Sequence, residues 1–275
     1  MKGIDIIIPV HKYNDDVKAL LNRCLTSVND MIKATTNDIK VDIQIVVSNS
    51  EMEKEISSQM VTWTDKVSSV TIAENKSGEF DFCSQVNYAT NNLCKNEFFM
   101  VVEYDDMVTE KWLNMVYPYI ETREKCPLFL PLVEVYDIKD TKKPKYYVNE
   151  MGWSSSFSEN ELGSLSNNLL MDYCNFNITG AVINTSKFNK SGGLKPSIKV
   201  SFGYELLLRL SHLYSEVYVV PKVGYFHFIN RDDSLTAEYH KTMTQEEGSW
   251  WIKLATQEYL FKKDRNKTYN PDEKE

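Results

Sequence analysis

The sequence predicts an α/β fold: a mostly parallel sheet flanked by helices, with a small helical extension at the C-terminal end. Two observations predict it. Runs of β-branched residues such as Ile4–Val10 and Val41–Val47 are typical of strands buried on both faces of a sheet. Between these runs, apolar residues recur every three or four positions, the pattern of helices that pack on a sheet. Alternating strands and helices favour parallel strands joined by right-handed crossovers.

The expected elements follow one another along the chain. Strands are predicted at Ile4–Val10, Val41–Val47, Val67–Ala73, Phe98–Val102, Leu128–Tyr136, Val217–Val220 and Gly224–Phe228, and regular structure also at Ile178–Asn184. Helices are predicted after the candidate N-caps Asn14–Asp16 and along Met52–Met60, Phe82–Leu93, Trp112–Ile120 and Glu205–His212. A tail from about Gln245 is expected to form an amphipathic helix bearing Trp250, Trp251 and Tyr259, followed by a charged, frayed terminus.

The stretch from Asp137 to Asn177 shows neither the apolar runs of buried strands nor the regular apolar spacing of helices. It is rich in Ser, Asn, Lys and Tyr, and a long irregular segment inside a compact domain is usually functional or mobile. Its aromatic side chains either stack on a bound acceptor or pack beneath a loop; they are Tyr146, Tyr147, Trp153 and Phe157.

Composition restricts the classes of protein that this chain can belong to. Its 275 residues are 42% hydrophobic and 25% charged, enough for one large folded domain. The formal net charge of −8 makes broad nucleic-acid binding unlikely to be its role, because phosphate neutralisation needs a basic face. The five cysteines are scattered without metal-ligand spacing, which indicates reduced thiols and a cytoplasmic protein.

Membrane and secretion signals are not found in the sequence. The apolar run near the N-terminus is too short for a signal peptide and meets Pro9. Later stretches fall short of the roughly 20 apolar residues that cross a bilayer. We therefore expect a protein that is not itself embedded in a membrane.

An acidic turn follows the most central of the expected strands. Glu103, Tyr104, Asp105 and Asp106 come directly after the apolar run FFMVV. Ligands of open α/β sheets bind beyond the carboxyl ends of the strands, and carboxylate oxygens suit Mg²⁺ or Mn²⁺. Glu103 and Asp105 are expected to face that crevice together, since alternate residues of a strand point the same way. The alternative is a solvated turn in which Asp106 or Thr109 caps the next helix.

Several segments resemble, in order and spacing, family 2 glycosyltransferases of the GT-A fold. The segments are IDIIIPVHKYN, VVSNS, ENKSGEFDFCSQVNYATNN, FFMVVEYDD, NITGAVINTSKFNKSGGLKP and VGYFHFINRDDSLT, and they extend over roughly residues 3 to 237. The resemblance implies a Rossmann-like GT-A domain over residues 1–240 and a helical tail over 241–275. About residues 1–107 would bind the nucleotide and about 108–240 the acceptor.

The resemblance also implies a donor site for a nucleotide-diphosphate sugar, UDP in particular, with Mn²⁺ or Mg²⁺. The residues that it places at the donor are Pro9, Val10, His11, Asn49, Ser50, Gly78, Glu103, Tyr104 and Asp105. Asp105 would be the principal metal ligand and Glu103 would face the ribose or the metal. His227 is either a third metal ligand or a packed core histidine. The acceptor stays open between a polysaccharide, a lipid, a protein and a nucleobase.

The catalytic base is where the chain departs from the family pattern. Inverting members carry an acidic pair before a helix that ends in arginine, and counting back from Arg209 puts Phe202 and Gly203 at that pair. Glu205 is the candidate base, because direct displacement needs a carboxylate beneath the acceptor hydroxyl. The alternatives are that Glu205 is an acid favoured by the helix dipole, and that the enzyme is retaining or takes its base from the middle segment.

Other nucleotide-binding folds fit the sequence less well. A Rossmann dehydrogenase needs G-x-G-x-x-G after the first strand and a P-loop enzyme needs G-K-[ST], and the sequence contains neither. The remaining rival is a catalytically inactive nucleotide- or carbohydrate-binding module on the same fold. Phe202, Gly203 and Asn49 favour that module, whereas the pair Glu103 and Asp105 favours an enzyme.

Overall fold

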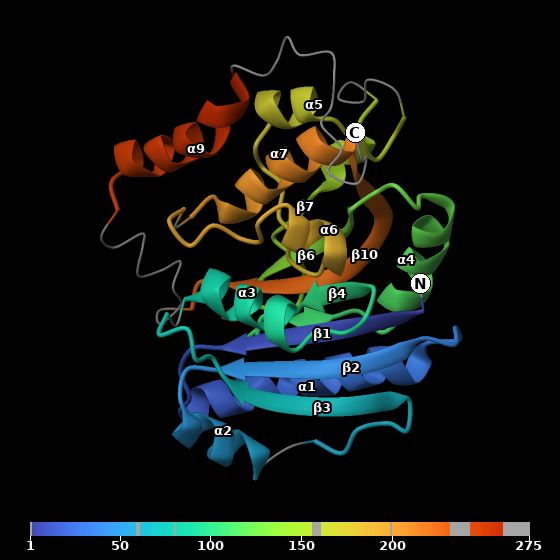
Figure 1. Cartoon of the computed structure of the whole chain (residues 1–275), viewed down its shortest axis with the longest axis vertical. Coiled ribbons are helices and arrows are strands. Elements are labelled where there is room, and N and C mark those ends of the chain that lie inside the picture. Colours follow the sequence, from blue (N-terminus) through green and yellow to red (C-terminus); the bar gives the residue numbers. More distant parts are fainter. Residues whose placement is uncertain are drawn as a thin grey trace.

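The computed structural model describes residues 2–58, 61–79, 81–155, 161–198, 200–231 and 243–260. Within them, one sheet has the strand order β3-β2-β1-β4-β9-β6-β10-β5, with β7 beside β6 and β8 beside β10 (Figure 1). The strands are β1 (Gly3–Val10), β2 (Lys40–Val47), β3 (Val67–Glu74), β4 (Phe98–Val101), β5 (Met107–Val108), β6 (Leu128–Asp137), β7 (Tyr146–Val148), β8 (Ser164–Leu165), β9 (Val182–Asn184) and β10 (Val217–Ile229).

Helices cover both faces of this sheet. They are α1 (Asp15–Ala34), α2 (Ser50–Ser57), α3 (Phe82–Asn92), α4 (Trp112–Thr122), the 3₁₀ helix η1 (Glu150–Trp153), α5 (Asn167–Asp172), α6 (Thr185–Lys190), α7 (Phe202–Tyr214) and α9 (Gln245–Leu260). In Figure 1, α1 lies behind the sheet, α3 and α6 lie in front of it, and α9 lies beside α5 and α7 at the end away from β3. No described helix is long and apolar enough to cross a membrane.

The alternation of side chains along β1 explains its continuous apolar run. Ile6 and Ile8 pack into a core that includes α1, whereas Ile7 packs into a second core on the opposite face with α3, α6 and α7. Since both faces are covered, neither set of side chains can be polar. The Asn14 side chain then accepts a hydrogen bond from the Val17 backbone N–H and starts α1, as predicted.

The predicted α/β class with a mostly parallel sheet is confirmed. The pairs β1–β2, β1–β4, β2–β3 and β6–β10 are parallel. The short strand β9 is antiparallel to both β4 and β6, so it joins the two parallel parts of the sheet. The carboxyl ends of β1, β2, β3 and β4 therefore meet at one edge of the first part.

The main differences from the predictions concern three segments. The strands predicted at Val217–Val220 and Gly224–Phe228 form one strand, β10, whose register shifts between Val219 and Tyr225 accommodate Pro221. The segment predicted to be irregular contains β7, η1, β8 and α5. Of Ile178–Asn184, only the last three residues are a strand.

Some predictions fall outside the described residues. They are Met60 of the second helix, Phe157, the part of the RDDSLT segment beyond Arg231, the side chain of Tyr259 and the charged terminus. The predicted C-terminal helix is present as α9, while the domain division near residue 240 stays a prediction.

Candidate functional site

A cluster of titratable side chains lies where the turn after β4 meets the last residues of β10. Potential ligand atoms of Glu103, Asp106 and His227 all lie within 4.8 Å of one another. Glu103 and Asp106 belong to the turn between β4 and β5, and His227 lies on β10. The antiparallel pairing of β5 with β10, at Met107 opposite Phe226, brings the turn and the histidine together.

Asp106 is the centre of this cluster. Its side chain is 0% exposed. One carboxylate oxygen lies 2.8 Å from His227 Nδ1, and the other accepts a hydrogen bond of 2.8 Å from the Phe228 backbone N–H. One side chain thus fixes two consecutive residues of β10. Nδ1 is engaged by the carboxylate, which leaves Nε2 as the imidazole nitrogen for a ligand.

Glu103 is held beside this pair through its backbone. The Tyr225 hydroxyl accepts a hydrogen bond of 3.0 Å from the Glu103 N–H, and Tyr225 is fully buried on β10. Among the described residues, the Glu103 carboxylate accepts only a long hydrogen bond, of 3.4 Å, from the Thr179 hydroxyl. The rigid backbone and the weakly engaged carboxylate are suited to ligand binding.

Asp105 points to a different partner. Its carboxylate forms an ion pair with Arg231 at 3.0 Å, and Arg231 also donates to the Tyr104 hydroxyl at 2.8 Å. The Arg23 guanidinium donates to the Asp105 backbone carbonyl and lies 4.1 Å from the centre of the Phe228 ring. Two arginines therefore surround the acidic turn.

Burial and mutual repulsion shift the protonation of the cluster. Burial raises the pKa of Glu103 to about 8, and the charges of Asp106 and Asp105 add to the shift. Burial and the charge of Asp106 raise the pKa of Asp105 to about 6, although the positive charge of Arg231 opposes this shift. Burial lowers the pKa of His227, but the charge and hydrogen bond of Asp106 outweigh burial and raise this pKa to about 9. Protons thus occupy positions that a cation would take.

The structure brings together two of the three residues predicted as metal ligands. Glu103 and His227 are in the cluster, and the third member is Asp106 in place of Asp105. Carboxylate and imidazole donors fit Mn²⁺, and the carboxylates fit Mg²⁺. The sequence interpretation of Asp106 as a helix cap does not describe its contacts, since α4 begins at Trp112 after Lys111 without a side-chain cap.

The residues predicted at the nucleotide base lie at the neighbouring strand ends. Pro9 and Val10 end β1, and the Val10 carbonyl accepts a hydrogen bond from the buried Gln85 side chain at 3.2 Å. The His11 carbonyl accepts from Ser48 at 3.0 Å, and its ring lies 5.4 Å from the Tyr104 ring. His11 and Tyr104 thus connect the end of β1 to the acidic turn.

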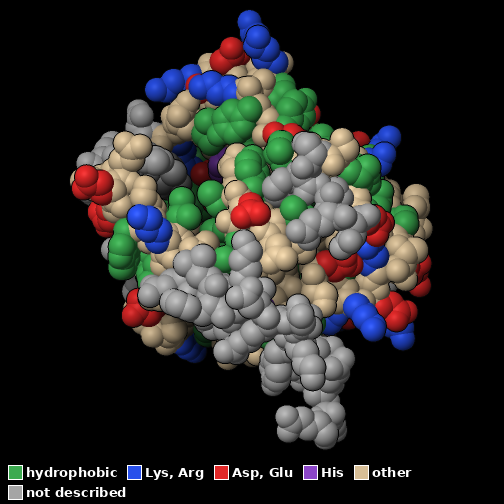
Figure 2. Space-filling view, turned by 90° about the horizontal axis from the view of Figure 1, so that it is seen from above, with side chains coloured by type: hydrophobic (Ala, Val, Ile, Leu, Met, Phe, Trp, Pro, Cys, Tyr) green, Lys and Arg blue, Asp and Glu red, His purple; other side chains and the backbone are tan. Residues whose placement is uncertain are grey.

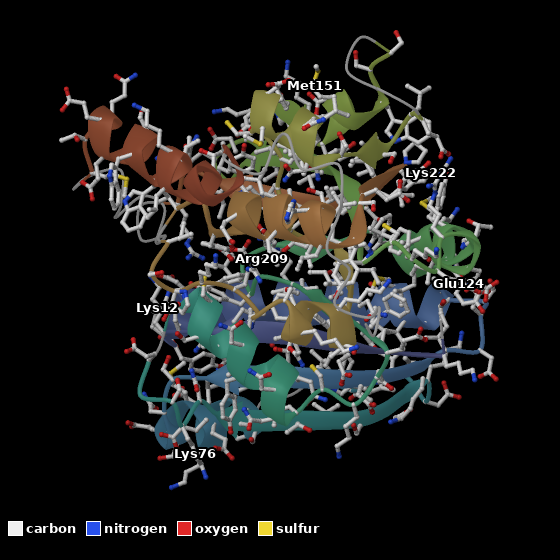
Figure 3. The ribbon with its side chains drawn as sticks, turned by 45° about the horizontal axis from the view of Figure 1, so that its top comes forward. Lys12, Lys76, Glu124, Met151, Arg209 and Lys222 are labelled. Carbon is white, nitrogen blue, oxygen red and sulfur yellow. The ribbon has the colours of Figure 1, made fainter. Side chains whose placement is uncertain are left out.

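The second group of predicted donor residues lies around α2. The Asn49 side chain accepts from the backbone N–H groups of Glu51 and Met52, so it caps α2, whose first residue is Ser50. Gly78 has a φ of +82°, and a Cβ added there would meet no atom of the described residues within 4 Å. In Figure 3, the labelled Lys12 and Lys76, which follow β1 and β3, lie on the same side of the molecule. The nucleotide-binding roles of Asn49, Ser50 and Gly78 stay predictions.

Glu205 lies away from the cluster, in a buried ion pair. Its side chain is 1% exposed, and its oxygens contact Arg209 Nη2 at 2.8 Å and Lys195 Nζ at 2.8 Å. Arg209, labelled on α7 in Figure 3, also donates to the carbonyls of Ser191 and Gly193. These contacts tie α7 to the turn before it. A base role for Glu205 stays a prediction.

A cavity of about 950 Å³ opens beside the cluster. Glu103 and His227 line it, as do Phe202, Gly203 and the sequence-predicted aromatic Tyr146. Trp153 instead donates from its indole N–H to the Val219 carbonyl at 2.7 Å. Figure 2, which views the molecule from above, shows hydrophobic side chains around a hollow in the surface.

Sequence reasoning missed the contributions of Asp106, Arg231 and Arg23. A usable signal was present for two of them. Asp106 is the last residue of the acidic turn, and Arg231 follows the strand of His227 within the segment resembling the family. Arg23 lies in the middle of α1, where only the folded structure shows its contact with the turn.

Comparison with known proteins supports the fold. No protein-family model and no curated protein matches the chain. The structure of TarS residues 1–349 from S. aureus with UDP-GlcNAc aligns with a TM-score of 0.64 and 12% identity, over 94% of this chain and 67% of that one. The UDP complex gives a TM-score of 0.57 and 13% identity over 94% and 66%. Against the longer TarS chain the TM-score is 0.59 at 12% identity, and this chain spans 40% of it. The expected GT-A fold is confirmed.

The raised pKa values predict that divalent cations bind more tightly as the pH increases. A cation must displace the proton of His227, whose pKa is about 9, and that of Glu103, whose pKa is about 8. Between pH 7 and pH 8 we therefore expect the affinity for Mn²⁺ to rise about tenfold or more. Calorimetric titrations at the two pH values, in buffers of different ionisation enthalpy, measure the affinity and the protons released. An affinity that is the same at both would rule out cation binding at these groups.

The ion pair of Glu205 predicts that Glu205→Gln lowers the free energy of unfolding by about 3 kcal/mol, because it leaves the buried guanidinium of Arg209 short of a counter-charge. Urea denaturation measures the change, and Glu247→Gln, at an exposed helical position, is the control. If Glu205→Gln unfolds like the parent protein but transfers no sugar, the result would instead support Glu205 as the catalytic base.

Proposed function

We propose that this chain is a glycosyltransferase that moves a sugar from a UDP-sugar to an acceptor hydroxyl with the help of a divalent cation. The observation that carries the proposal is the cluster of Glu103, Asp106 and His227 at the strand ends of a GT-A fold. The solved structures of TarS with UDP and UDP-GlcNAc support this choice of donor.

The donor set of the cluster fits Mn²⁺ or Mg²⁺. Glu103 and Asp106 offer hard carboxylate oxygens and His227 offers an imidazole nitrogen. When bound, the cation neutralises the charge that develops on the departing diphosphate. Asp106 orients His227 through Nδ1, and Tyr225 positions the backbone of Glu103.

The two arginines near the acidic turn also fit the proposed binding of a diphosphate. Arg231 lies between Asp105 and Tyr104, and Arg23 contacts the same turn. A diphosphate that enters next to this turn meets two guanidinium groups, which suit phosphate oxygens well. Asp105 stays a proposed ligand, which would have to exchange Arg231 for the cation.

The nucleotide is proposed to lie over the ends of β1 and β2. Pro9, Val10 and His11 would contact the base and ribose through backbone groups, with Asn49 and Ser50 at the base and Gly78 near the donor. The first part of the chain, to about residue 107, would then hold the donor, and residues from about 108 to 240 the acceptor. Five free cysteines fit a cytoplasmic location.

An inactive donor-binding module on the same fold is the second candidate. The specific observation in its favour is that Phe202 and Gly203 line the cavity where inverting relatives would carry an acidic pair. The described lining offers two carboxylates, Asp81 and Glu103, and Asp81 caps α3. A protein that binds UDP-sugar but neither hydrolyses nor transfers it would support the module.

The proposed function predicts UDP binding that depends on Mn²⁺. Asp106→Asn and His227→Ala should each weaken it by about 10- to 100-fold, because both remove the pair that orients the site. Calorimetric titration of UDP with and without Mn²⁺ measures the effect, and Asp140→Asn, at an exposed carboxylate, is the control.

The variant Asp105→Asn tests whether Asp105 or Asp106 is the metal ligand. Loss of Mn²⁺-dependent binding in this variant, with binding retained in Asp106→Asn, would restore the assignment made from the sequence. Unchanged affinity in both variants would contradict a metal site at this turn.

A further inference from the structure

The cavity beside the cluster is a large space with mainly apolar walls. Its volume of about 950 Å³ is at the upper end of the range for small-molecule sites, which is about 300–1,000 Å³. Helices and strands from distant parts of the chain form it, including Phe82 and Val86 of α3, Leu206 of α7 and Ile252 of α9. Such walls gain free energy from a hydrocarbon group and none from a sugar hydroxyl.

The side chains along this cavity do not suit an acceptor that is rich in phosphate groups. Among the described residues that line it there is no lysine and no arginine; the carboxylic acids are Asp81 and Glu103, and His227, at the cluster, is the basic side chain. A phosphate-rich acceptor would need cationic side chains along its path. The walls are therefore complementary to an uncharged molecule.

Polar side chains line the cavity at the cluster and also along another wall, where Ser201, Thr244, Gln245 and Ser249 belong to it. Glu103, His227 and Thr179 all line it, and the Thr179 hydroxyl contacts Asn177 at 2.7 Å and Glu103 at 3.4 Å. A ligand with one polar end and one apolar end can place its hydroxyl at Glu103 and His227 and its apolar part against the apolar walls.

We propose that the acceptor is an amphiphile, a hydroxyl-bearing molecule whose uncharged hydrocarbon group occupies this cavity. This inference rests on the proposed function, because only a transferase has an acceptor. The binding of the hydrocarbon group itself does not require a donor or a metal. It narrows the acceptor to molecules that carry an apolar group next to the hydroxyl that receives the sugar.

Gly248 of α9 provides a variant that fills the cavity without disturbing the fold. It lines the cavity, and among the described residues a Cβ added there meets the sulfur of Met243, at 4.0 Å. Replacing a glycine inside a helix by alanine or tryptophan also favours the helix. We therefore expect the indole of Gly248→Trp to occupy the cavity, and Gly248→Ala is the matched control that leaves it open.

The test is a series of alkyl β-glucosides from methyl to hexyl, titrated calorimetrically below the concentrations at which they form micelles. In the parent protein and in Gly248→Ala, each added methylene should tighten binding about fourfold, as burial of a methylene does. In Gly248→Trp this dependence on chain length should disappear. Equal affinity for all chain lengths in the parent, or the same dependence in Gly248→Trp, would overturn the proposal.

A parallel titration of UDP with Mn²⁺ separates the two claims. If chain length matters but UDP does not bind, the cavity assignment holds and the proposed function fails. If UDP binds with Mn²⁺ and chain length has no effect, the transferase survives and the amphiphilic acceptor is wrong.

Discussion

The buried pairing of Asp106 with His227 is the interaction on which the candidate site depends. Asp106 is closed off from water, so its two oxygens must be satisfied by the protein, one by His227 and one by the Phe228 backbone. The acidic turn after β4 is thereby fixed to the end of β10, about 120 residues later in the chain. Glu103, held by Tyr225, occupies the remaining side of the cluster. Without this pairing neither the charges nor the cavity opening would lie where they do.

Much of the fold could be predicted from the sequence, because a strand covered on both faces must be apolar throughout, as β1 and β2 are. The ligand set was harder to predict for a physical reason. Glu103 and Asp105 were paired on the assumption that the strand continues, but β4 ends at Val101 and the Asp106 N–H bonds to the Glu103 carbonyl in a turn. A turn changes which side chains face the same way. Asp106 therefore lies with Glu103, and Asp105 faces Arg231.

The two parts of the site that depend on distant segments could not be predicted. Glu205 has the sequence position of a helix-terminal acid, but only the fold shows that Lys195 and Arg209 enclose it. The cavity draws its walls from α3, β4, α7 and α9, and no local pattern records how such segments meet. The same assembly suggests why an acidic pair is absent at Phe202 and Gly203: in this chain that position belongs to an apolar wall.

The measurement that tests the account most directly is a crystal structure of the protein grown with Mn²⁺ and UDP, with the anomalous signal of manganese recorded. The account predicts one manganese peak in contact with Glu103 and the Asp106–His227 pair, bridged to the diphosphate of UDP. A nucleotide bound elsewhere, or a manganese ion held by other residues while His227 keeps only Asp106, would contradict it.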